Sequence, residues 1–179
     1  MLKTLHQIAS IGIVSETAPQ ADESLRLRDG LQDQIRAVLG RALCIRHIDA
    51  GSCNGCELEI QALNNPLYNI EGLGIRFVAS PRHADLLLVT GPVSKHMEMA
   101  LRRTYEATPD PKLVVALGDC GCTGGIFGES YATLGRVSNV IPVDVAVPGC
   151  PPSPTRILQG ILTAFARTPA PAAGAGETP

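Results

Sequence analysis

Short apolar segments that alternate with helical segments are the feature that most constrains the fold of this chain. After residue 43 the sequence consists of brief runs rich in Val, Leu and Ile, separated by stretches with helical periodicity. Strands that alternate with helices favour a parallel sheet in a three-layered α/β architecture. The expected strands are 43–48, 75–79, 85–90, 113–118 and 144–147. The expected helices are 55–64, 93–107 and 153–167.

The composition divides the chain into three parts. Residues 1–42 form an N-terminal extension, in which 21–42 places leucines among charges at helical spacing and predicts an amphipathic helix. Residues 43–167 form the α/β domain. The tail, 168–179, has almost no large apolar side chain, so we expect it to be disordered.

Charge and hydropathy exclude several classes of function. The net charge is −2, and there is no Lys/Arg run of the kind that neutralises phosphates, so nucleic acid is not an expected partner. No apolar run approaches the roughly 20 residues of a membrane helix, and we expect neither a span nor an export signal. Six cysteines in a chain expected to stay in the cytosol are more consistent with ligands or buried thiols than with disulfides.

Four cysteines follow three of the expected strands. Cys53 and Cys56 form a CxxC in GSCNGCELEI, between a strand and a helix. Cys120 in ALGDCGCTGG comes directly after the run KLVVAL, and Cys150 in VAVPGCPPSP comes directly after DVAV. Because carboxyl ends of parallel strands meet at one edge of a sheet, we expect three loops to bring four sulfur atoms together there.

Four thiolates suit either an iron-sulfur cluster or a structural zinc ion. Zinc sites usually take their ligands as two close pairs, whereas here one pair is joined by two single cysteines on separate glycine-rich loops. This spacing favours the cluster and leaves zinc as an alternative. A thiol-disulfide oxidoreductase is a second alternative, because a CxxC at a helix start is also the thioredoxin arrangement, but it leaves Cys120 and Cys150 unexplained.

Several co-linear motifs carry a family resemblance. The segments CNGCELEI, SPRHADLLLVTGPV, GDCGCTGGIFGE and VDVAVPGCPPSP together resemble the complex I 20 kDa (B) subunits and the nickel-iron hydrogenase small subunits, over about residues 43–166. The CxxC is similar to that of hydrogenases, since complex I usually has adjacent cysteines at this point. The chain therefore resembles most the energy-converting, membrane-bound hydrogenase branch, which includes formate hydrogenlyase and hydrogenase-4 types.

The resemblance implies a flavodoxin-like fold and one 4Fe-4S cluster on Cys53, Cys56, Cys120 and Cys150. It implies an electron-transfer subunit that passes electrons between ferredoxin-like subunits and the active site of a large subunit, which holds nickel-iron or, in complex I, the quinone pocket. The expected partners are these subunits and integral membrane subunits of the same complex. The expected location is peripheral, on the cytoplasmic side of the membrane. Hydrogenase is the first reading, and a complex I type of subunit the alternative.

Two further cysteines and an acid near the CxxC need interpretation. Cys122 is two residues from Cys120 and could replace it as a ligand, although position 120 matches the family better. Cys44, within an expected strand, is interpreted as a small buried hydrophobic residue. Glu57 is placed to interact with the dipole of the following helix, and a proton-relay or potential-tuning role is a second hypothesis.

The remaining candidates are basic. Arg82 lies in the SPRHAD segment, which the resemblance implies is near the cluster and the large-subunit interface, so a tuning role is a hypothesis beside that of a solvated loop. The histidines lack a ligand spacing and are interpreted as ordinary polar positions: His6, His47 and His96.

Overall fold

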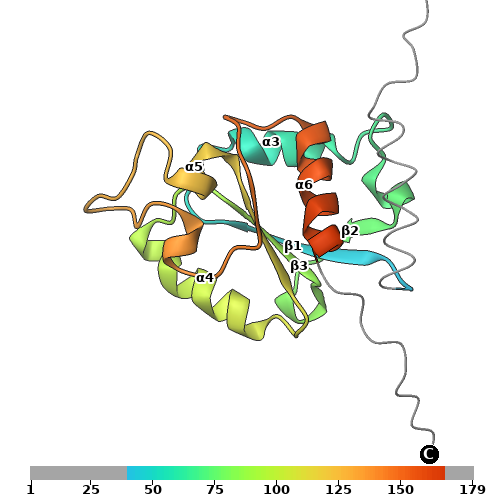
Figure 1. Ribbon diagram of the computed structural model, residues 1–179, viewed down its shortest axis with the longest axis horizontal. Helices are drawn as coiled ribbons and strands as arrows, with labels where there is room; N and C mark the ends of the chain where they lie inside the picture. The colour runs from blue at the N-terminus through green and yellow to red at the C-terminus, as the bar shows by residue number, and fades with distance from the viewer. Residues whose placement is uncertain (1–39, 168–179) are drawn as a thin grey trace, which may run out of the picture.

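The computed structural model describes residues 40–167, which form an open sheet between helices (Figure 1). Residues 40–42 lead into the first strand without helical structure. The rest of the helix expected in 21–42 and the tail 168–179 lie outside the described residues.

The sheet is entirely parallel. Its strands are β1 (Leu43–Asp49), β2 (Ile75–Phe77), β3 (Leu86–Thr90), β4 (Leu113–Leu117) and β5 (Val145–Val147). They are arranged in the order β2-β1-β3-β4-β5. This is the flavodoxin-like order. Strand β2 is added on one side of β1, and β3, β4 and β5 are then added on the other side. The expected fold class is therefore confirmed.

Helices cover both faces of the sheet. The α-helices are α3 (Gly55–Ala62), α4 (Lys95–Ala107), α5 (Gly118–Thr123) and α6 (Pro154–Arg167), and the 3-10 helices are η1 (Ile70–Leu73), η2 (Pro81–His83) and η3 (Val137–Asn139). In Figure 1, α3 and α6 lie on one face and α4 on the other. The long helices were expected from the sequence. The short helix α5 was not, because its glycine-rich sequence has no helical periodicity.

The strands in the middle of the sheet contribute buried side chains to the core on both faces. All five residues of β3 are buried, as expected for a central parallel strand covered on both faces. Leu86 and Leu88 face the α3 and α6 side, whereas Leu87 and Val89 face the α4 side. Each fully buried leucine contributes about 1.5–3 kcal/mol of hydrophobic stabilisation. The two layers of apolar side chains thus hold the strands in the order described.

Helix α6 packs closely on β5, the last strand of the sheet, at Gly160. Its buried residues, Ile157, Leu158, Ile161, Ala164 and Phe165, recur at helical spacing and face the core. Gly160 lies over β5, where an added Cβ atom would be 2.2 Å from Cγ2 of Val147. The glycine therefore sets how closely this helix packs on β5.

None of the helices within residues 40–167 has the length and hydropathy required to cross a bilayer.

We predict that Gly160→Val lowers the free energy of unfolding by about 1–3 kcal/mol, because the valine side chain overpacks the contact with Val147. Thr163→Val is the matched control, since Thr163 lies on the same helix and is exposed. Urea denaturation of the two variants measures the difference. Equal stability would show that α6 does not depend on this close approach.

Candidate functional site

Four cysteines lie where the strands end. Cys53 is in the turn after β1, Cys56 is in the first turn of α3, and Cys150 is in the turn between β5 and α6. Cys120 lies in α5, which directly follows β4, and not on a loop as expected. All four therefore gather at the carboxyl edge of the sheet, toward the top of Figure 1, where α5 and the beginning of α3 lie near each other. We call this group of four residues the cysteine edge.

Glycine backbone packs directly against two of these sulfur atoms. A Cβ atom at Gly118 would lie 2.6 Å from Sγ of Cys56, and one at Gly125 would lie 2.8 Å from Sγ of Cys120. Both glycines also have positive φ, at 80° and 56°, which a side chain would strain. Any larger residue at either position would push into the space around the sulfur atoms. The two glycines thus keep that space open for a bound group.

Asp119 joins the turns that carry Cys120 and Cys150. Its backbone N–H donates to the carbonyl oxygen of Gly149 at 2.9 Å, and its Oδ1 accepts from the N–H of Gly149 at 2.8 Å. The beginning of α3 lies beside the Cys150 turn, because an added Cβ at Gly55 would be 3.9 Å from Cδ of Pro151. Segments nearly 100 residues apart in the chain are thereby fixed against one another.

The sulfur atoms influence one another electrostatically. Burial, together with the charges of Glu57, Cys120, Cys53 and Cys150, raises the pKa of Cys56 to about 12. Burial also raises the pKa of Cys120, assisted by Cys150 and Cys53. Four thiolates at this edge would repel one another, so a positively charged group is required to hold them together in the ionised form.

The four cysteines offer a donor set of the kind that holds an iron-sulfur cluster. Among residues 40–165, no three His, Cys, Asp or Glu side chains are positioned to hold one metal ion. The mutual effects on pKa nevertheless show that the four sulfurs are neighbours. In a cubane cluster each thiolate binds a different iron, so four cysteines from separate segments can be distributed around one group. The donor set and the glycine-lined space both fit a 4Fe-4S cluster.

Cys122 and Cys44 point away from the cysteine edge. The Cys122 thiol packs against the apolar residues on the α4 side of the sheet and donates to the carbonyl oxygen of Ala116 at 3.5 Å. Burial raises its pKa to about 11. Cys44 is buried near the beginning of β1, as expected. Within the described chain, neither is placed to join the four other thiols.

Glu57 is buried and bonded, not simply exposed at a helix start. Its Oε1 accepts a hydrogen bond from Oγ1 of Thr90, the last residue of β3. His47 Nε2 lies 3.0 Å from the same hydroxyl and 3.6 Å from Glu57 Oε1. The sequence analysis missed His47 and Thr90. Their signal was present, since each is the polar end of an apolar alternation, at positions 43, 45 and 47 and at positions 86, 88 and 90.

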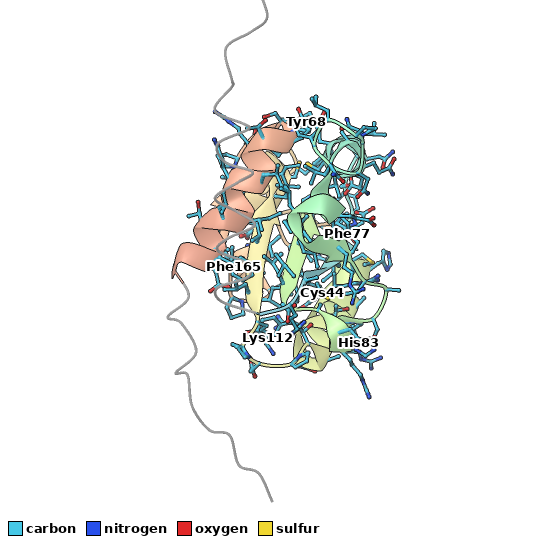
Figure 2. The ribbon with its side chains drawn as sticks, turned by 90° about the vertical axis from the view of Figure 1, so that its right-hand side faces the viewer. Cys44, Tyr68, Phe77, His83, Lys112 and Phe165 are labelled. Atoms are coloured by element: carbon cyan, nitrogen blue, oxygen red, sulfur yellow. The ribbon has the colours of Figure 1, made fainter. Side chains whose placement is uncertain are left out.

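Arg82 is not brought to the cysteine edge. It lies in η2, before β3, and lines a cavity with Arg41, Arg76, His83 and other residues. That cavity also includes residues 109–111, which precede β4, so it lies at the amino ends of the strands. Figure 2 turns the right-hand side of Figure 1 toward the viewer and labels Cys44 and His83 from this lining. The geometry therefore gives no support to a role for Arg82 beside the cysteines.

Comparisons with known proteins agree with this arrangement. Residues 53–164 match the family model described as NADH ubiquinone oxidoreductase, 20 kDa subunit. The chain is 48% identical to a probable membrane-bound hydrogenase subunit of Pyrococcus furiosus, over 74% of this chain and 79% of the relative. It is 45% identical to formate hydrogenlyase subunit 7 of Escherichia coli, over 70% of this chain but only 49% of the relative.

A solved structure is similar as well. It is a chain from the structure of the membrane-bound sulfane sulfur reductase, an archaeal respiratory membrane complex. The TM-score is 0.62 and the sequence identity is 34%, and the match covers 81% of this chain and 75% of that chain.

We predict that Cys122 is alkylated slowly in the folded, reduced and metal-free chain, in which the other thiols are also free to react. A pKa of about 11, raised from 9.0, leaves roughly a hundredfold less thiolate at pH 8 than an unshifted thiol. Mass spectrometry after timed iodoacetamide treatment measures this, with the exposed Cys53 as the internal reference. The difference should vanish in denaturant. Equal rates in the folded chain would contradict the buried position of Cys122.

Proposed function

This chain belongs to the family of the 20 kDa subunit of NADH ubiquinone oxidoreductase, and on that premise we propose that its cysteine edge holds one 4Fe-4S cluster for electron transfer. Members of the family are subunits of oxidoreductase complexes, and so is this chain. The observation that carries the proposal is the convergence of four thiols from three separate segments of the chain, each of which follows a strand. The proposed ligands are Cys53, Cys56, Cys120 and Cys150.

The chain contributes a rigid, partly dry cradle to this function. When bound, the cluster supplies one-electron transfer between two oxidation states. The thiols of Cys56 and Cys120 are half-buried, whereas Cys53 and Cys150 are exposed. The ligand turns are tied by the hydrogen bonds of Asp119, so the sulfur atoms keep their positions. The exposed side of the edge is where a redox partner would approach.

The two rival chemistries are supported less well. A thioredoxin-like dithiol uses only the Cys53–Cys56 pair and leaves Cys120 and Cys150, whose charges act on Cys56, without a role. Structural zinc sites usually take their ligands as two close pairs, whereas here one CxxC pair is joined by two single cysteines, Cys120 and Cys150.

A membrane-bound hydrogenase is the complex that we propose for this subunit. The CxxC spacing and the similarity to hydrogenase and formate hydrogenlyase subunits favour it over an NADH-quinone oxidoreductase, which is the alternative. In this proposal the chain passes electrons from a ferredoxin-like subunit to a large nickel-iron subunit. It would sit peripherally on the cytoplasmic side of the membrane, bound to integral membrane subunits of the same complex.

An apolar loop beside the cysteine edge is the proposed contact with the large subunit. The loop joins α5 to η3 and extends from the sheet on the left of Figure 1. It exposes Ile126, Phe127 and Tyr131, at 93%, 53% and 92% of their surface. Exposed apolar groups gathered in this way mark protein interfaces.

The same loop is held in a fixed shape. Leu134 N–H donates to the carbonyl of Val93 at 2.7 Å, and Val93 N–H donates to the carbonyl of Gly135 at 2.9 Å. The Thr133 hydroxyl donates to the carbonyl of Gly128 at 2.7 Å. A preformed loop loses little entropy on binding, which suits a permanent subunit contact.

The ligand assignment is tested on the complex purified anaerobically through a tag on this chain. We predict that single alanine substitutions of the four proposed ligands abolish the EPR signal of this cluster, whereas Cys122→Ala and Cys44→Ala retain it. Iron and acid-labile sulfide at roughly four each per chain would support the cluster. Nickel in the same sample would favour hydrogenase over the quinone-reducing alternative. Zinc without sulfide, or a full signal in Cys120→Ala, would overturn the assignment.

The docking loop is tested separately. We predict that the double variant Ile126→Ser, Tyr131→Ser weakens binding of the large subunit about 30-fold, which corresponds to about 2 kcal/mol. Leu67→Ser is the control, because Leu67 is also an exposed apolar residue but follows α3. Pull-down titration measures the affinity. An unchanged affinity in the double variant would place the interface elsewhere.

A further inference from the structure

A buried polar group lies directly beneath the cysteine edge. Glu57, Thr90 and His47 come from α3, β3 and β1 and meet on the side of the sheet that α3 covers. Thr90 is fully buried and Glu57 is 8% exposed. Their neighbours along the strands are the core residues Ile45 and Leu88. Polar groups in such surroundings are stabilised only by bonds to one another.

The three side chains form a directional chain of hydrogen bonds. Burial lowers the pKa of His47, so its ring is neutral and one ring nitrogen carries a proton. One assignment of the protons gives all three side chains a partner. In it, His47 Nε2–H donates to Thr90 Oγ1, and the Thr90 hydroxyl donates to Glu57 Oε1. The carbonyl of Ile48 is 3.4 Å from the same hydroxyl and is the weaker acceptor. Thr90 is therefore the central member of the group.

Glu57 is the contact between the first turn of α3 and the sheet. The buried residues of α3 are Glu57 and Ile60, and Ile60 lies one turn later. Asn54, which precedes the helix in a left-handed conformation, provides no side-chain cap. The turn that contains Cys56 is thus held at its beginning by the backbone bond from Leu58 N–H to Asn54 at 3.2 Å and by the Glu57–Thr90 contact.

Burying Glu57 at this position is energetically unfavourable for one of its two oxygen atoms. Glu57 Oε2 is buried and has no hydrogen-bond partner among the described residues. Leaving a carboxylate oxygen unsatisfied is unfavourable, and an apolar residue here would avoid the penalty. A polar group retained at such a cost is consistent with a requirement for position rather than for stability.

We infer that Thr90, supported by His47, positions Glu57 and through it the Cys56 thiol at the cysteine edge. The inference rests on the proposed function in that Cys56 is a ligand. Thr90 and His47 are positioning residues in this scheme and do not touch the bound group. Partners of this kind orient metal ligands in many proteins, and their loss weakens metal retention.

The test compares three variants of the full chain within the anaerobically purified complex. Thr90→Val removes the hydroxyl at nearly constant volume, and Thr90→Ser restores it. Thr108→Val is the matched control, because Thr108 is also buried but lies at the end of α4, where it donates to the carbonyl of Thr104 at 2.8 Å.

Two measurements separate this inference from the proposed function. The first is amide hydrogen exchange in the peptide of residues 54–60, which reports the order of the Cys56 turn whether or not iron is bound. The second is the rate of iron release to a chelator, which we expect to rise about tenfold to a hundredfold in Thr90→Val. Thr90→Ser and Thr108→Val should match the wild type in both.

The outcomes are distinct. Faster exchange and faster iron release in Thr90→Val alone would support the inference. Faster exchange in a complex without iron would support the positioning role and overturn the cluster proposal. Unchanged exchange in Thr90→Val, or a Thr90→Ser variant as impaired as Thr90→Val, would overturn the inference while leaving a cluster in the wild type intact.

Discussion

Parallel pairing of the strands is the constraint on which the rest of this structure depends. Because β1, β4 and β5 run in the same direction, the turns that follow them emerge at a single edge, although they are far apart in the chain. The strands keep this arrangement through their burial on two faces, above all in β3. Without that order, the four thiols would have no common location.

Close contacts at the edge turn this proximity into a defined site. Asp119 exchanges two hydrogen bonds with Gly149, and the backbone at Gly118 leaves no room for a side chain beside Cys56. These contacts hold the sulfur atoms without filling the space between them. Burial and mutual repulsion raise the pKa of the inner thiols, so the site is arranged for a positively charged group. Binding that group would stabilise the turns in return.

The two ends of the sheet serve different purposes. The carboxyl edge carries the cysteines and, close to the end of β3, the buried Glu57 group. The amino edge carries the arginine-lined cavity with Arg82. The resemblance placed Arg82 near the cluster, but the segment that contains it precedes β3 and so lies at the end of the sheet opposite to the cysteines. The length of the strands therefore separates Arg82 from the cysteines, although the motifs that contain them occur in the same family.

The sequence by itself determined the α/β class, the strands, the long helices and the convergence of the cysteine-bearing turns. These follow from local periodicity and from the rule that parallel strands end at one edge, and neither requires distant contacts to be known. Only the tertiary structure decided which of Cys120 and Cys122 faces that edge, since the short helix α5 turns them to different sides. It also decided that Thr90 and His47 meet Glu57. Such pairings depend on the register between strands and on helix packing. Thr90 is 33 positions from Glu57 and 43 from His47, and no local pattern in the sequence relates residues at these separations.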